Sequence, residues 1–477
     1  MRFTIGGHHV EGVTLPGLPG VVLGRNDRAA WGFANLYADV QDLYRETFVS
    51  GGEQVRRGAG VEEVRSRVET IAVRGGAPDL WRVRETSHGP LVRGPFALKW
   101  VALDPANLRL PETRLMFADS ADGLLRAFDD FLLPAQSVVV ADASGTIGWR
   151  AAGVLPVRRP GTDGSVPYDG SDPANDWTGL VPGSAMPRVV NPPSGLLVTA
   201  NQRVVGTTFP HTVTTDWPSP VRARRIRDLL EEARRAGRKL DRAAMEAIQF
   251  DTVSEPLRVL AAAFAPALPP DLAAGFRGWD GRAAAGSRPF LVARTLRRQL
   301  ELVVRRAWHV TGDPISIPEY RLVDIARASA DAWWSSGLGE KDVVLAECAE
   351  AAVRELEMRF GTDASRWTWG EANRLAARHP LGRVFGLSWL FDPPRVIQSG
   401  ATGTPRAAAP TFGQSMRFIV DWGEPEAATL VVPFGVSGHV GSPHRLDQLP
   451  YWLGGDATGA ATRLERPATG ERLVFRP

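Results

Sequence analysis

Cysteine is almost absent from this chain of 477 residues, since Cys348 is its only one. A single cysteine excludes an internal disulfide and any zinc site built from several cysteines. The apolar residues around it lie at helical spacing, namely Val344, Leu345, Ala352 and Val353. We therefore predict a buried structural thiol on an amphipathic helix.

Long apolar runs are absent as well. No stretch reaches the ~20 consecutive apolar residues that a membrane-spanning helix needs. Residues 1–10 also lack the apolar core and small-residue cleavage site of a signal peptide. We expect no membrane span and no export signal within this sequence.

Lysine is scarce, with only Lys99, Lys239 and Lys341, so arginine carries nearly all the positive charge. The formal net charge is only +3, and the arginines alternate with acids rather than forming a basic stripe. We therefore expect no nucleic-acid partner. An apolar content of 44% predicts a globular protein with a large core.

The hydrophobic pattern changes twice along the chain. It predicts a β-rich part over residues 1–220, a helical part over 221–380 and a second β-rich part over 381–477. Predicted strands lie at 20–24, 137–142, 195–200, 416–420, 428–434 and 472–477, and predicted helices at 226–233, 291–304 and 343–358. Strands from both ends can share a sheet, so we expect one interrupted domain. Residues 400–410 have the composition of a surface loop.

A series of short motifs follows in order along nearly the whole chain. They are GVTLPGLPG at 12–20, GRND at 24–27, WGFANLYADVQDLY at 31–44, SHGP at 87–90, ADASGTIG at 141–148, TAN at 199–201, IQFD at 248–251, GQSMR at 413–417 and GVSGH at 435–439. Taken together they resemble the β chain of the penicillin acylase (penicillin amidase) family of N-terminal nucleophile hydrolases.

The resemblance implies an α+β fold, a four-layer αββα sandwich with a helical insertion, and residues 1–477 as one β-chain-like domain without the first β-chain strands. It implies hydrolysis of a linear amide in a small N-acyl substrate, through an acyl-enzyme on an N-terminal serine. It also implies a heterodimer with an α chain from the same precursor, and a periplasmic or secreted location.

Three residues match the family's catalytic positions. The resemblance makes the side chain of Asn201 and the backbone N–H of Asn35 the two donors to the oxyanion. It places Arg222 near the amine of the nucleophile, where a fixed positive charge lowers the pKa of that amine. The alternatives are a simple turn at Asn201 and a solvated first helical turn at Arg222.

Two carboxylates match a calcium site of the family. Asp39 and Asp42, with the backbone carbonyl of Gln41 between them, supply oxygen ligands that suit a hard cation such as Ca²⁺. Asp216 is a further candidate ligand. Solvated loop carboxylates are the alternative interpretation.

The histidines permit a rival interpretation as a metal site or a serine hydrolase. His8, His9, His439 and His444 are the candidate metal ligands, and Ser87–His88 is the candidate catalytic pair. No further ligand falls at a persuasive spacing, and the chain has no G-x-S-x-G motif, so we interpret these residues as structural.

The sequence departs from the family in two places. Ser137 stands where the family has an asparagine, which puts one polar contact in doubt. The first serine, Ser50, follows the 31–44 motif, so we expect the nucleophile to come from a segment upstream of Met1. The alternative is a catalytically silent remnant that acts as a binding or scaffold protein.

Overall fold

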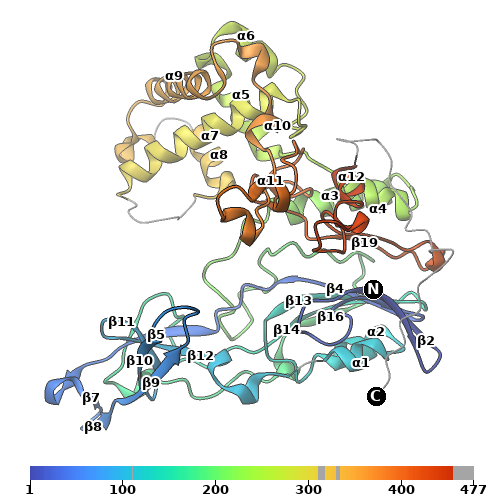
Figure 1. The fold of residues 1–477 in the computed structure, drawn as a ribbon. Coiled ribbons are helices and arrows are strands. Elements are labelled where there is room, and N and C mark those ends of the chain that lie inside the picture. Colours follow the sequence, from blue (N-terminus) through green and yellow to red (C-terminus); the bar gives the residue numbers. More distant parts are fainter. Residues whose placement is uncertain (110, 310–316, 329–332, 455–477) are drawn as a thin grey trace. The chain divides into compact units, whose positions relative to one another are not determined.

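The computed structural model describes residues 1–109, 111–309, 317–328 and 333–454. The chain forms two compact units, Met1–Pro218 and Ser219–Pro477. The first unit carries the large sheets and the second carries the long helices (Figure 1).

The first unit is built on a seven-stranded antiparallel sheet. Its strands, in spatial order, are β1 (Arg2–Ile5), β2 (His8–Val13), β3 (Leu23–Asn26), β4 (Ala29–Asn35), β13 (Gln136–Asp142), β14 (Ile147–Ala152) and β16 (Arg188–Val190). Helices α1 (Glu112–Met116) and α2 (Ala121–Ala127) pack on one face, where Trp31, Leu124 and Val138 are buried together. The strand predicted at 137–142 is confirmed by β13, whereas the one predicted at 20–24 begins only at Leu23.

The glycines of the first motifs allow two strands to approach closely. Gly12 on β2 and Gly24 on β3 lie opposite each other in register. A side chain at Gly12 would overlap the carbonyl of Leu23, and one at Gly24 would overlap that of Glu11. The side chain of Val21 packs against both glycines and is fully buried. These two glycines therefore allow β2 and β3 to pair at close approach.

A second sheet of six strands completes most of the first unit. Its spatial order is β15 (Tyr168–Asp169), β5 (Gln41–Arg45), β12 (Phe96–Trp100), β11 (Gly89–Arg93), β10 (Asp79–Thr86) and β9 (Arg65–Ile71). Only the β15–β5 pairing is parallel. A small sheet of β6 (Phe48–Val49), β7 (Gln54–Arg57) and β8 (Gly60–Glu63) follows β5.

Three helices of the second unit begin at a side chain that caps the helix N-terminus. The helices are α3 (Val221–Arg235), α4 (Arg242–Gln249), α5 (Glu255–Phe264), α6 (Pro270–Gly275), α7 (Arg288–Ala307), α8 (Glu319–Arg327), α9 (Lys341–Phe360), α10 (Trp369–Ala372), α11 (Ser388–Phe391) and α12 (Leu449–Leu453). The side chains of Asp241, Ser254 and Ser287 accept backbone N–H bonds at the starts of α4, α5 and α7. Such caps satisfy N–H groups that have no partner inside the helix.

The core of the second unit lies among α5, α7, α8 and α9, where Phe264, Phe290 and Leu322 are fully buried. The helices predicted at 291–304 and 343–358 are confirmed by α7 and α9. Cys348 on α9 is buried, as predicted, and burial raises the pKa of its thiol to about 12. The thiol is therefore protonated and unreactive at neutral pH.

Three sequence predictions about strands are either wrong or lie outside the described residues. No strand forms at 195–200, where the chain is irregular. The predictions at 416–420 and 428–434 are confirmed by β19 (Arg417–Ile419) and β20 (Thr429–Val431). Within the described residues these pair only with each other, as do β17 (Ala408–Ala409) and β18 (Phe412–Gly413), so the prediction of a sheet shared by both chain ends is wrong there. The strand predicted at 472–477 lies outside the described residues.

The segment 400–410 is largely buried, so the prediction of a surface loop is wrong. Gly400 N–H donates to the carbonyl of Ala283 at 2.8 Å, and Arg406 N–H donates to that of Asp251 at 2.9 Å. Thr404 is fully buried and its hydroxyl lies 2.8 Å from the carbonyl of Arg406. The small residues of this segment allow its backbone to pack closely against its neighbours. A flexible loop has the same composition, so composition alone does not separate the two cases.

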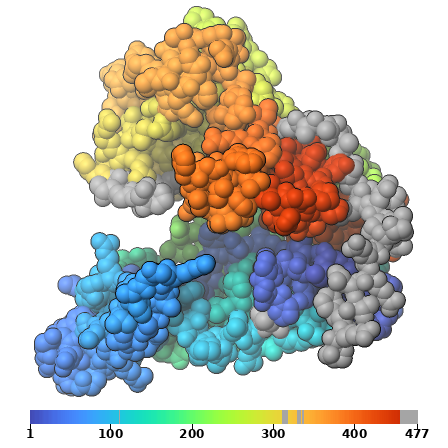
Figure 2. Space-filling model, in the orientation of Figure 1, coloured from blue at the N-terminus to red at the C-terminus, as the bar shows by residue number. Residues whose placement is uncertain are grey.

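Figure 2 shows the segment 380–395, in orange, at the surface of the second unit, and this segment exposes several large apolar side chains. Its exposed members are Leu381, Val384, Phe385 and Trp389. In the described part of the chain, no helix combines the length and the apolar character needed to cross a bilayer.

Candidate active site

Two of the predicted catalytic residues lie in contact, although they are far apart in sequence. The side-chain amide of Asn201 donates to the backbone carbonyl of Asn35 at 3.0 Å. Asn201 adopts a left-handed backbone conformation, with φ of 72°, and so does Tyr37, with φ of 60°. Strained non-glycine residues of this kind concentrate at functional sites. The structure thus brings Asn35 and Asn201 together at the end of β4.

The backbone of Asn35 faces the same side as the amide of Asn201. In an antiparallel ladder, residues alternate between those whose N–H and C=O both bond to the partner strand and those whose groups point away. Just beyond the ends of this ladder, the N–H of Ala143 donates to the carbonyl of Arg28, and the N–H of Leu36 donates to the carbonyl of Ala135. Even-numbered residues on the β4 side therefore bond to the β13 side, and the backbone N–H and C=O groups of odd-numbered β4 residues point away from β13. On the side of β4 opposite β13 lies β3, and its pairing with β4 extends along β4 only as far as Trp31. The N–H of Asn35 therefore lies at an open ladder position beside Asn201.

The turn that carries Asn201 is held by its neighbours. The side chain of Gln202 accepts from the N–H of Ala200 at 2.7 Å and donates to the carbonyl of Val198 at 3.0 Å. Two N–H donors on a fixed turn and a strand end can stabilise a negative oxygen without reorganising. Gln202 was not predicted, although it directly follows the TAN motif.

Ser137 provides a polar contact to this turn in spite of its departure from the family. Its hydroxyl lies 2.7 Å from that of Thr199 and accepts from the indole N–H of Trp149 at 2.7 Å. Ser137 itself is buried on β13. The segment that precedes Asn201 is therefore hydrogen-bonded to the central sheet.

The predicted Arg222 lies in the second unit, half-buried on the first turn of α3. Its neighbour Arg225 forms a bidentate pair with the buried carboxylate of Asp251, at 3.0 and 2.7 Å. Asp251 ends the IQFD motif, so this motif anchors α3. Sequence reasoning did not predict that role.

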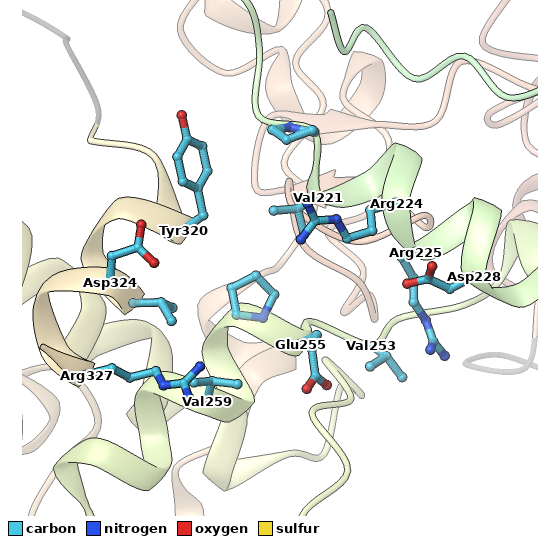
Figure 3. Close-up of a pocket in the computed structure, with 13 residues that line it drawn as sticks. Val221, Arg224, Arg225, Asp228, Val253, Glu255, Val259, Tyr320, Asp324 and Arg327 are labelled. Atoms are coloured by element: carbon cyan, nitrogen blue, oxygen red, sulfur yellow. The ribbon is translucent and has the colours of Figure 1, made fainter.

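The second unit has a cavity of about 700 Å³ between α3, α5 and α8. Figure 3 shows Arg224, Tyr320, Asp324 and Arg327 around this space. Charges of both signs line it together with valines and prolines. The lining thus carries three arginines and three carboxylates.

The predicted calcium ligands Asp39 and Asp42 contact a guanidinium instead. Arg158 Nε lies 2.9 Å from Asp42 Oδ2, and its Nη2 lies 3.2 Å from Asp39 Oδ2. Burial raises the pKa of Asp39. Burial opposes the charge on Arg158, but hydrogen bonding to Asp42 prevails and raises the pKa of the guanidinium. Gln41 pairs with Trp100 between β5 and β12.

These residues do not fit a calcium ion as they are arranged. A calcium ion takes six to eight oxygen ligands at ~2.3–2.6 Å. Here the carboxylate oxygens face N–H donors, and the exposed Asp216 has no contact with them among the described residues. Calcium binding at Asp39, Gln41 and Asp42 stays a prediction.

His88 is fully buried between two carboxylates. Its Nδ1 lies 2.8 Å from Glu46 Oε1 and its Nε2 lies 3.0 Å from Asp176 Oδ1. Burial opposes ionisation of Glu46, but hydrogen bonds from His88 and Thr86 lower its pKa. Both ring nitrogens are occupied, and Ser87 donates to a different acid, Glu62. The geometry therefore gives no serine–histidine pair.

Two of the other histidines pair with acids close to them. His9 pairs with Asp27 at 3.1 Å and His444 with Asp447 at 2.9 Å, both at exposed positions. Over the described ranges, no group of three or more metal-ligating side chains gathers. The contacts that the structure shows for these histidines agree with a structural role.

The architecture defines the class of protein. Over its whole length the structure is similar to a thermostable penicillin G acylase from Alcaligenes faecalis, with a TM-score of 0.71 at 20% sequence identity and 94% coverage of that chain. The fold is therefore that of the N-terminal nucleophile hydrolases, a mixed α+β fold, as predicted.

The sequence then identifies the family. The penicillin amidase family model matches residues 1–465, so the chain belongs to the penicillin amidase family. It is 32% identical to a penicillin acylase 2 proenzyme from a Pseudomonas species, over 92% of this chain and 60% of that protein. It is 27% identical to the acyl-homoserine lactone acylase QuiP of Pseudomonas aeruginosa, over 98% of this chain and 64% of that protein. The chain spans less than two thirds of the length of these relatives.

Proposed function

We infer that this chain is the oxyanion-binding part of an amide hydrolase of the penicillin acylase type, which cleaves the linear C–N bond of a small N-acyl compound. The observation that carries this inference is the hydrogen bond between the Asn201 amide and the Asn35 carbonyl. It requires the N–H of Asn35 and the amide of Asn201 to lie on one side of the strand end. Both relatives reported above are named acylases, which supports an N-acyl substrate.

In the proposed mechanism the nucleophile is an N-terminal serine that residues 1–477 do not supply, and an α chain of the same precursor completes the enzyme. The α-amine of that serine takes the proton of its hydroxyl while the oxygen attacks the amide carbon. The N–H groups of Asn35 and Asn201 stabilise the resulting oxyanion.

Two steps then complete the reaction. The protonated α-amine returns its proton to the leaving amine as the C–N bond breaks, which leaves an ester on the serine. Water attacks this ester and releases a carboxylic acid and the free serine. In this proposal the positive charge of Arg222 lowers the pKa of the α-amine, so that a larger fraction is neutral and able to accept a proton.

The proposal is tested with protein purified from its natural source. The protein is incubated with benzylpenicillin and with N-acyl-homoserine lactones of short and long acyl chains, and the released amine and carboxylic acid are both quantified. We expect equal amounts of amine and acid from at least one substrate. Release of neither product from any of these amides would contradict the proposal and favour a silent binding or scaffold protein.

A further inference from the structure

The Asp39–Asp42 carboxylate pair has its positive partner within the chain. Arg158, whose side chain is 5% exposed, contacts both acids, and the side chain of Asp42 is 1% exposed. Its Nη2 also donates to the backbone carbonyl of Asp39 at 3.1 Å and lies 3.2 Å from Asp42 Oδ1. One planar guanidinium thus binds two carboxylates and a carbonyl.

A second donor completes the binding of Asp42. The indole N–H of Trp177 donates to Asp42 Oδ2 at 2.5 Å. Both carboxylate oxygens of Asp42 and the carbonyl of Asp39 therefore already accept hydrogen bonds, and one carboxylate oxygen of Asp39 forms an ion pair with the same guanidinium. Because a hard cation needs these same oxygens, the guanidinium and the cation exclude each other.

The loop that follows Arg158 covers this cluster. Gly164 has a φ of 83°, and a Cβ at this position would lie 2.5 Å from Asp39 Oδ2 and 2.6 Å from Asp42 Oδ1. The N–H of Gly164 donates to the hydroxyl of Tyr168 at 2.9 Å, and Tyr168 begins β15, which pairs with β5. The backbone thus occupies the space through which further oxygen ligands would approach.

We propose that Arg158 is the fixed cation of the Asp39–Asp42 pair, and that it fastens the 158–168 loop onto β5 where a calcium ion would otherwise be required. The protein then binds no calcium at these acids, and its stability does not depend on calcium. Removal of the guanidinium leaves two adjacent carboxylates without the counter-charge that contacts them directly, and a divalent cation can bind them.

The native protein gives the first test. After dialysis against metal-free buffer, its calcium content is measured by mass spectrometry, and its melting temperature is recorded with excess EDTA and with millimolar CaCl₂. We expect much less than one calcium per chain and the same melting temperature in both buffers. One tightly held calcium per chain, together with a melting temperature that falls in EDTA, would overturn the proposal.

Substitution of the arginine gives the second test. Arg158→Ala in EDTA should lower the melting temperature by roughly 5–10 °C, because a buried charge pair loses one member. Millimolar CaCl₂ should restore at least half of this loss in the variant while leaving the native protein unchanged. A variant that melts like the native protein would overturn the proposal.

Two further variants keep the result interpretable. Arg159→Ala removes the neighbouring exposed arginine, whose partners are Asp172 and Asn175, and should change neither stability nor calcium response. Arg158→Lys retains the positive charge and should remain insensitive to calcium. If Arg158→Ala does not fold, the native calcium content and Arg158→Lys still decide the question.

Discussion

Replacement of Asn201 by glycine separates the catalytic role of its amide from its structural role. Glycine accepts the φ of 72° without strain, so the substitution keeps the turn. It removes the side-chain hydrogen bond to the Asn35 carbonyl at 3.0 Å, and such a bond is worth about 0.5–1.5 kcal/mol. The left-handed backbone is unfavourable for a residue with a Cβ, though less so for asparagine than for most, and its relief offsets part of this loss. The melting temperature should therefore change by no more than about 4 °C.

The effect on catalysis should be far larger. Loss of one oxyanion donor lowers kcat by about 10²–10³-fold, or about 2.7–4 kcal/mol of transition-state stabilisation. The assay is steady-state hydrolysis of an N-acyl substrate by the complete enzyme, with kcat and KM determined separately. We expect the loss in kcat, with KM little changed, because the oxyanion exists only in the transition state and intermediate.

Asn191→Gly is the matched control. Asn191 also has a positive φ, of 43°, and its side chain accepts one hydrogen bond, from the N–H of Ile147 at 2.9 Å. The two substitutions should change stability equally, but only Asn201→Gly should reduce kcat. A kcat for Asn201→Gly within about threefold of wild type would refute the assignment of Asn201 as an oxyanion donor.

Two further predictions concern buried polar groups. The pKa of Glu46 is lowered in the folded state, so its contribution to stability is present above the usual carboxylate pKa of ~4.3 and is lost as the pH falls through the lower folded value. Glu46→Gln should therefore reduce the free energy of unfolding at pH 7, as measured by urea unfolding, and make this free energy fall less steeply below about pH 4.5. If the free energy of unfolding of the variant falls below about pH 4.5 as steeply as that of the native protein, the pairing with His88 is contradicted. Ser137→Ala leaves the Thr199 hydroxyl and the Trp149 indole without their shared partner and should cost about 1–3 kcal/mol of stability. It should also lower kcat about tenfold while KM stays constant, because the turn of the oxyanion donor loses its anchor, and a fall in stability without loss of kcat would limit Ser137 to a structural role.

Local patterns predicted the elements well where a single period extends over many residues. The helical spacing at 291–304 and 343–358 appears as α7 and α9, and Cys348 is buried as its neighbours indicated. Short apolar segments predicted strands less well. The apolar residues at 195–200 form no strand, because the chain there follows the turn of the candidate active site instead of a sheet edge.

The sequence predicted the members of the candidate site but not what holds them. Asn35 and Asn201 were predicted and lie in contact. The partnership of Asp42 with Arg158, 116 residues further along the chain, has no signal in a single sequence because the fold alone brings them together. For the same reason, the role of Asp251 as the anchor of Arg225 became visible only in the structure.

The source of the nucleophile is the central claim, and covalent labelling of the active protein tests it most directly. The native enzyme is inactivated with a serine-reactive sulfonyl fluoride, and the labelled peptide is sequenced together with the N-terminus and intact mass of each chain. We predict one label on a serine that is the first residue of its chain and lies outside residues 1–477, with a second chain present. An active preparation of a single polypeptide beginning at Met1, or a label on any serine within residues 1–477, would contradict the account.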